Sequence, residues 1–98
     1  MPVRVRGYLT YKEVIGEQSI ALPDDGELLV SALLALLASQ LGGDFSILIY
    51  DPDTGMLSDH AAVLINGRSY RNLPEGLETP LQDGDDIAIF PPMAGGYS

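Results

Sequence analysis

The stretch "LLVSALLALLASQL", residues 28–41, is the longest apolar run of the chain and decides its fold. Leucine and alanine are strong helix formers, so this run predicts a helix. The leucines that share one face at helical spacing are Leu29, Leu33, Leu36 and Leu37, with Leu34 and Leu41 partly off it. Gly42 and Gly43 are expected to end the helix. Asp24 or Asp25 is expected to cap its start.

Short apolar segments on both sides of this helix predict strands. Residues 3–9 alternate apolar and polar side chains, and residues 19–23 follow as the second strand of a hairpin. After the helix, strands are expected at residues 45–50, from residue 61 to the Asn66-Gly67 turn, and at 87–90. Strands around one helix indicate an α+β fold, a mixed four- to five-stranded sheet packed on one main helix. If the first and last strands pair in parallel at its centre, the tail leaves from the end of the sheet.

The composition excludes several classes of function. The 98-residue chain has fourteen acidic and five basic side chains. The resulting net charge of −9 disfavours nucleic acid as a partner. There is no cysteine for a disulfide, a thiolate metal site or a nucleophile. Residues 28–41 are too few to span a bilayer, which needs roughly 20 residues. We therefore expect a cytoplasmic protein with no membrane partner.

No catalytic or metal site is expected within the domain. His60 is the only histidine, so the chain has few residues from which a catalytic triad or a histidine-rich metal site could be built. Asp51 and Asp53 faintly resemble the start of a calcium loop, but the later ligands are missing and a turn is favoured. The "DGDD" stretch at 83–86 could hold a cation, but we expect it to form a β-turn, which needs no cation.

The C-terminal stretch "FPPMAGGYS", residues 90–98, is the strongest functional signal. We expect a domain at residues 1–90 and a flexible tail at 91–98. Pro91 and Pro92 lack N–H donors and hold the chain extended. Met93 and Ala94 are modest in size, and Gly95 and Gly96 have no side chain, so such a tail could thread a narrow tunnel in a second protein. The alternative is a frayed end without function.

The chain resembles the small sulfur-carrier proteins of molybdopterin and thiamine biosynthesis, which have the ubiquitin-like β-grasp fold. The resemblance rests on "PLQDGDDIAIFPPMAGG" at 80–96 and "VLINGRSY" at 63–70, and it is closer to the molybdopterin synthase small subunit. It implies a carrier without catalytic activity of its own. A ubiquitin-activating-enzyme-like adenylyltransferase would use its own ATP and magnesium to adenylate the Gly96 carboxylate, and sulfur would then replace the adenylate to give a thiocarboxylate.

The same resemblance implies how partners bind. The tail would insert into the molybdopterin synthase large subunit, Phe90 would pack against a partner, and an acidic turn would meet basic residues there. The residues of that turn are Asp83, Asp85 and Asp86. No cofactor is expected on this chain itself.

Tyr97 and Ser98 depart from the family pattern, because Gly96 then has no free carboxylate. We expect a precursor from which a peptidase removes these two residues. Two alternatives stay open. The chain could be a ubiquitin-like modifier joined through Gly96 to lysines of other proteins, or an unprocessed interaction subunit.

Overall fold

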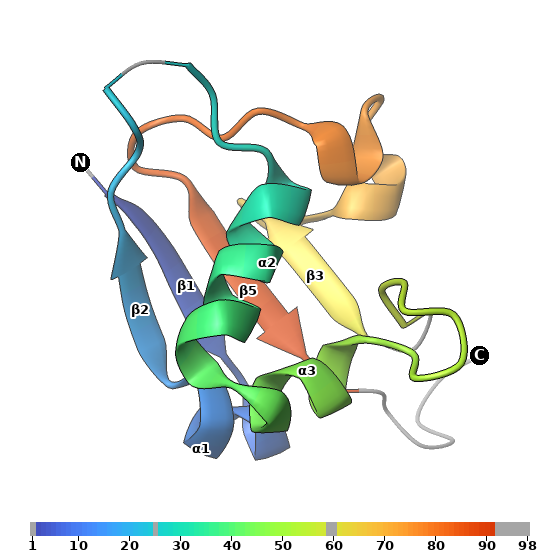
Figure 1. Cartoon of the computed structure of the whole chain (residues 1–98). Coiled ribbons are helices and arrows are strands. Elements are labelled where there is room, and N and C mark those ends of the chain that lie inside the picture. Colours follow the sequence, from blue (N-terminus) through green and yellow to red (C-terminus); the bar gives the residue numbers. More distant parts are fainter. Residues whose placement is uncertain (1, 25, 59–60, 92–98) are drawn as a thin grey trace.

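The last strand of the chain, β5 (Asp86–Phe90), lies at the centre of the sheet in the computed structural model (Figure 1). The structure describes residues 2–24, 26–58 and 61–91. Within these residues, five strands form one mixed sheet in the order β2-β1-β5-β3-β4. β5 runs parallel to β1 (Val3–Gly7), with Val5 opposite Ile87. The parallel pairing of the first and last strands, which the sequence left as a condition, is therefore present.

The remaining strands extend the sheet on both sides by antiparallel pairing. β2 (Glu17–Ile20) pairs with β1, and β3 (Ala62–Ile65) pairs with the other edge of β5. β4 (Arg68–Ser69) follows β3 after the expected turn, where Asn66 and Gly67 have φ of 52° and 86°. Two positive φ angles match the type I′ turn that joins two strands with the correct twist.

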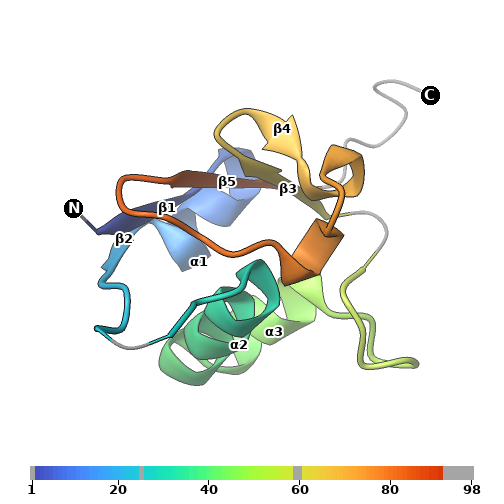
Figure 2. The ribbon, with the colours of Figure 1, turned by 90° about the horizontal axis from the view of Figure 1, so that it is seen from above.

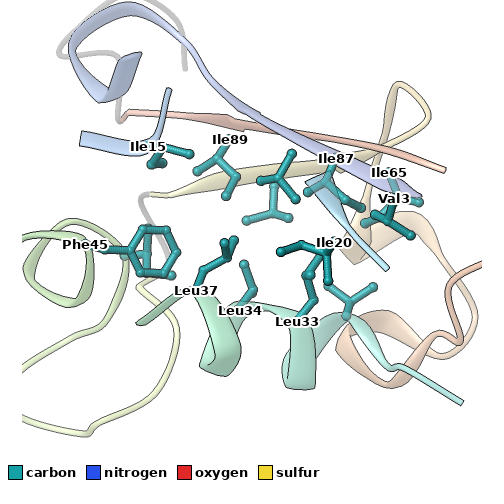
Figure 3. Close-up of a cluster of buried hydrophobic side chains, with 14 of the residues drawn as sticks. Val3, Ile15, Ile20, Leu33, Leu34, Leu37, Phe45, Ile65, Ile87 and Ile89 are labelled. Carbon is teal, nitrogen blue, oxygen red and sulfur yellow. The ribbon is translucent and has the colours of Figure 1, made fainter. Parts of the chain in front are cut away.

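Two helices cover one face of the sheet, α2 (Val30–Leu41) and α3 (Gly43–Ile49), as Figure 2 shows. Alternate residues of the central strands point toward them, because successive side chains of a strand face opposite sides. The resulting core packs the sheet against α2 and α3 (Figure 3). Its fully buried members include Val3, Val5, Leu33, Leu34, Leu37, Phe45, Ile49, Val63, Ile87 and Ile89.

The third predicted strand, residues 45–50, is wrong, because these residues lie mostly in α3. Phe45 and Ile49, four residues apart, are both fully buried, whereas Ile47 between them is 78% exposed. That spacing is helical, since residues four apart share one face of a helix. A short apolar run does not by itself distinguish a helix from a buried strand. Here the helical conformation allows both Phe45 and Ile49 to be buried in the core.

The predicted start and buried face of the main helix are also partly wrong. The helix begins at Val30, after Leu29, whose side chain makes no capping hydrogen bond, so Asp24 is not the N-cap residue; Asp25 lies outside the described residues. Instead the Val30 N–H donates to the carbonyl of Thr79 at 3.1 Å. Leu34 is buried and Leu36 is 38% exposed, which rotates the buried face from the predicted one. Gly42 does end the helix, with φ of 81°.

A helical connection joins the first two strands. β1 begins at the predicted residue but ends two residues early, and β2 begins two residues before its predicted range and ends three residues before that range ends. η1 (Leu9–Tyr11) and α1 (Lys12–Ile15) follow β1 directly and were not predicted. In the later connection from β4 to β5 lie two further turns of 3-10 helix, η2 (Tyr70–Asn72) and η3 (Gly76–Glu78). Over the described ranges, no helix has the length and apolar character that crossing a membrane requires.

Candidate functional site

The end of β5 from which the tail continues is built around a pair of aromatic rings. Tyr8 and Phe90 stack with ring centroids 4.6 Å apart and ring planes 7° from parallel. Both belong to the sheet face opposite α2, because the alternating residues Val5, Ile87 and Ile89 point into the core. Such a pair adds about 1 kcal/mol beyond the area it buries. Pro91, the next residue, is buried.

Backbone pairing on both sides fixes this end of the strand. Ala62 of β3 lies opposite Phe90, and the Tyr8 N–H donates to the Ile89 carbonyl at 3.0 Å. A strand in the centre of a sheet is held along both edges, so its last residue has little freedom to move. The tail therefore begins from a rigid root, which we define as Tyr8, Phe90 and Pro91.

The acidic turn lies at the other end of β5. Phe90 is four residues from Asp86, which corresponds to about 13 Å along a strand. The structure therefore does not bring the two predicted parts of the site together, since the aromatic root and the acidic turn occupy opposite ends of β5.

Asp85 and Asp86 make hydrogen bonds or ion pairs with residues of the domain. The Asp85 carboxylate accepts hydrogen bonds from the Gln82 N–H at 2.8 Å and the Asn66 side-chain amide at 3.0 Å. Asp86 pairs with the Arg6 guanidinium at 2.8 Å, and its N–H donates to the Asn66 side chain at 3.0 Å. Asp83 is exposed at the tip of the turn. The Asp85 carboxylate thus shapes the turn that leads into β5, and the Asp86 carboxylate joins the start of β5 to Arg6 of β1. The partner-facing role of the turn stays a prediction.

The connection that follows β1 is anchored close to the root. Gly7 donates its N–H to the Gly16 carbonyl at 2.9 Å and closes the base of this connection. The Tyr11 hydroxyl donates to the Leu48 carbonyl of α3 at 2.8 Å. Burial raises the pKa of the Tyr11 phenol above its ordinary value. The neutral phenol is therefore the form that the folded protein favours.

Sequence reasoning missed one feature at the root, a hollow of about 550 Å³ beside Tyr8 and Leu9. The alternation of β1 could have indicated Tyr8, because Arg4, Arg6 and Tyr8 share one face of the predicted strand. Pairing with the last strand then sets Tyr8 beside Phe90. Nothing in the local sequence indicates the hollow.

The Asp51–Asp53 segment forms a turn. The Asp51 carboxylate accepts the Asp53 N–H at 2.8 Å, and the Gly55 N–H donates to the Asp51 carbonyl at 2.7 Å. Within residues 2–24, 26–58 and 61–91, no three acidic or histidine side chains gather as a metal site would require. His60 is outside those residues.

Comparison with known proteins decides the family. The model of the ThiS family matches residues 9–96, which include every strand of the sheet except β1. The chain belongs to the ThiS family. The ThiS match ends at Gly96, the second residue of the glycine pair, and leaves Tyr97 and Ser98 outside.

Two curated relatives of this ThiS-family chain are similar to it in sequence over most of their length. Small archaeal modifier protein 3 of Haloferax volcanii is 38% identical over 96 residues, which are 98% of this chain and 100% of that protein. A putative sulfur carrier protein of Archaeoglobus fulgidus is 38% identical over 73 residues, 74% of this chain and 80% of that protein. The ThiS-family chain is accordingly a small carrier or modifier protein and not an enzyme.

A solved structure confirms the fold. Small archaeal modifier protein 1 of Methanosarcina acetivorans superimposes with a TM-score of 0.75 at 32% identity, covering 96% of this chain and 95% of that one. The predicted α+β, ubiquitin-like β-grasp fold of this ThiS-family chain is thereby confirmed. The residues of the predicted tail that lie outside the described part of the chain are Pro92, Met93, Ala94, Gly95, Gly96, Tyr97 and Ser98.

Proposed function

We propose that this chain is the precursor of a sulfur carrier whose active group is the Gly96 carboxylate. Removal of Tyr97 and Ser98 by a peptidase would release that carboxylate. A ubiquitin-activating-enzyme-like adenylyltransferase would then activate it. The thiocarboxylate formed at Gly96 would deliver sulfur to a molybdopterin-type or thiamine-type cofactor pathway, in the first case after the tail enters the molybdopterin synthase large subunit.

The observation that carries this proposal is the end of the family match at Gly96. A carrier needs a carboxylate at that position, and two residues of this chain extend past it. The 38% identity with a putative sulfur carrier protein supports the same chemistry. The rigid root supports it too, because a tail that begins from the centre of a sheet has a defined starting point.

The length and composition of the tail suit insertion into a second protein. Gly96 is six positions after Phe90. A fully extended chain spans at most about 3.3–3.6 Å for each residue, so Gly96 could reach about 20 Å beyond the root. A Cβ atom at Gly95 or Gly96 would add bulk where the chain has to pass close to the partner's backbone and to the nucleotide.

The proposed chemistry has two steps. An oxygen of the Gly96 carboxylate attacks the α-phosphorus of ATP, the bond to the β-phosphate oxygen breaks, and pyrophosphate leaves with magnesium. A sulfur donor at the oxidation level of sulfide then attacks the carbonyl carbon, and AMP leaves with the bridging oxygen. ATP and magnesium are held by the adenylyltransferase, which also supplies the stabilisation of the phosphoryl charge. The carrier supplies only the carboxylate and its position.

The test is ATP–pyrophosphate exchange with the adenylyltransferase from the same host. A protein ending at Gly96 should support exchange, and the 98-residue form should not until the two residues are removed. The matched control ends at Gly95, which keeps a terminal glycine carboxylate but shortens the reach by one residue. Equal exchange with all three forms, or none with the form ending at Gly96, would overturn the proposal.

A second function, the ubiquitin-like modifier, is favoured by one observation. The relative that matches over 98% of this chain is a small archaeal modifier protein. In that case a lysine amine of another protein would attack the activated Gly96 carbonyl and displace AMP, giving an isopeptide bond.

Conjugates of this chain can be recognised by a cleavage that its sequence permits. No lysine or arginine follows Arg71, so trypsin would leave a long remnant on the acceptor lysine. Cyanogen bromide cleaves after methionine and would leave Ala94, Gly95 and Gly96 attached after cutting at Met93. Branched peptides with this short remnant would show modification, and their absence from host cells that contain thiocarboxylate would favour the carrier alone.

A further inference from the structure

Asn66 and Gly67, which form the turn between β3 and β4, are also a chemically reactive pair. Asparagine is one of the thermolabile residues of proteins, because the backbone nitrogen of the next residue can attack its side-chain carbonyl carbon, Cγ. A glycine in the next position leaves that nitrogen without a side chain that would hinder the attack. Of the two asparagines of the chain, only Asn66 precedes a glycine, since Asn72 precedes Leu73. Asn66 is therefore the asparagine at which this reaction meets the least hindrance.

The structure holds both ends of the Asn66 carboxamide. Its nitrogen donates to a carboxylate oxygen of Asp85 at 3.0 Å, and its oxygen accepts the Asp86 N–H at 3.0 Å. The Asn66 N–H also donates to the Asp86 carbonyl at 2.8 Å. Asp85 is in turn fixed by the Gln82 N–H at 2.8 Å. The Asn66 side chain is thus tied to the acidic turn and not to the turn that it forms with Gly67.

These hydrogen bonds direct the side chain away from the nitrogen that would attack it. β3 lies between β5 and β4 in the sheet, as Figure 2 shows. The Asn66 side chain reaches the start of β5 at one edge of β3, whereas Gly67 leads the chain to β4 at the other edge. A reaction of this kind requires the two reacting atoms to be close and aligned. The side chain must therefore rotate, and both of its hydrogen bonds must break first.

Burial does not protect this pair. Asn66 and Gly67 are both exposed, so water has access to the turn. Exposed hydrogen bonds at the end of a strand open locally far more often than the whole domain unfolds. The rate of the reaction in the folded protein should therefore depend on how firmly Asp85 and Asp86 hold the side chain.

We propose that Asn66 is a site of self-modification that the acidic turn keeps unreactive. When the turn opens, the Gly67 nitrogen forms a bond to Cγ of Asn66, and the bond from Cγ to the side-chain nitrogen breaks. Ammonia leaves with the proton that the Gly67 nitrogen gives up. Water then opens the cyclic succinimide at either of its carbonyl groups, which leaves an aspartate or an isoaspartate at this position. The only co-reactant is water.

Either product prevents the turn from closing as before. The new carboxylate would face the Asp85 carboxylate, where a hydrogen bond of 3.0 Å now lies, and like charges at that distance repel. An isoaspartate also adds a carbon atom to the backbone of a turn whose two residues have φ of 52° and 86°. β4 is only two residues long, so few contacts remain to hold it. The modification is therefore irreversible and loosens both the β3–β4 turn and the start of β5.

The experiment follows the full chain during incubation at mildly alkaline pH, with and without urea. Trypsin cleavage after Arg68 separates Asn66 from Asn72, and conversion makes the peptide heavier by the difference between an oxygen atom and an NH group. Methylation by an isoaspartate methyltransferase identifies the isoaspartyl product. Conversion should be at least about ten-fold slower in the folded chain than in urea, because one hydrogen bond to a charged group already changes an equilibrium by about that factor.

Substitutions of the acidic turn test the role of Asp85. Asp85→Ala and Asp85→Asn both remove the charged acceptor, and each should speed conversion in the folded chain about ten-fold. The matched control is Asp83→Asn, which removes the same charge from the same turn, although neither hydrogen bond of the Asn66 carboxamide involves Asp83. Its rate should equal that of the unsubstituted chain. Circular dichroism shows whether each variant folds, and Asp85→Asn decides the matter if Asp85→Ala does not.

Three results would overturn the proposal. They are equal rates in the folded chain and in urea, equal rates in Asp85→Asn and Asp83→Asn, and no conversion of Asn66 even in urea. None of them bears on the proposed chemistry of Gly96.

Discussion

Replacement of Gly7 by alanine tests how tightly the connection after β1 packs on the sheet. The new Cβ atom would lie 2.7 Å from Ile15 Cβ and 2.7 Å from the Tyr11 carbonyl oxygen. Carbon atoms in contact prefer about 3.5–4.0 Å, so both neighbours would have to move by roughly an ångström. One of them is backbone, and the Ile15 side chain is 1% exposed, so neither can move into open space.

We expect Gly7→Ala to lower the free energy of unfolding by about 2–3 kcal/mol, the upper part of the range for overpacked cores. For a domain of this size that corresponds to a fall in Tm of roughly 10–20 °C. The assay is urea and thermal unfolding followed by circular dichroism.

Gly43→Ala is the matched control, because no atom lies within 4 Å of its new Cβ and it begins α3. It should instead raise stability by up to about 1 kcal/mol, since alanine is the better helix former. A loss under about 0.5 kcal/mol in Gly7→Ala, which is the ordinary range for surface substitutions, would refute the packing described for this connection. So would an equal loss in both variants.

Three further results are expected. Burial raises the pKa of the Tyr11 phenol above its ordinary value of about 10. The contribution of the neutral Tyr11 phenol to the free energy of unfolding is therefore complete below that pH and is lost as pH rises through the folded-state pKa. Tyr11→Phe should lower the free energy of unfolding by about 1 kcal/mol at neutral pH, because the hydrogen bond to the Leu48 carbonyl is lost, and it should reduce the loss of stability at alkaline pH. Urea titrations that show the same alkaline loss in both proteins would contradict this. Added salt should raise Tm, because it screens the repulsion of a chain with net charge −9, and a fall of Tm between low salt and about 0.5 M would be the opposite result. A double-mutant cycle of Tyr8→Ala and Phe90→Ala should give a coupling of about 0.5–1.5 kcal/mol in unfolding, and additive losses would show that the stacked rings do not interact.

The parts of the fold that follow strong local patterns could be predicted from the sequence. Residues 28–41 are long, apolar and rich in helix formers, and α2 lies within them. The Asn66-Gly67 pair correctly indicated the turn between β3 and β4. The order of the elements was compatible with the central parallel pair of β1 and β5 but did not require it, and only the structure establishes that pairing.

Other parts depend on tertiary contacts that local patterns do not contain. Residues 45–50 carry β-favouring side chains, but the core is filled by Phe45 and Ile49 at helical spacing. The start of α2 is set by the Thr79 carbonyl, a residue far along the chain. In the candidate site, Phe90 was predicted from the sequence. The hollow beside Leu9 was not, because it depends on a positive φ that a leucine in the sequence does not indicate.

The proposed function requires a free carboxylate at Gly96, which the intact mass of the protein isolated from its own host would reveal. We expect a species that lacks Tyr97 and Ser98, with a fraction heavier by the difference between one sulfur and one oxygen atom. Recovery of only the 98-residue form, from cells in which the sulfur-dependent pathway is active, would contradict it.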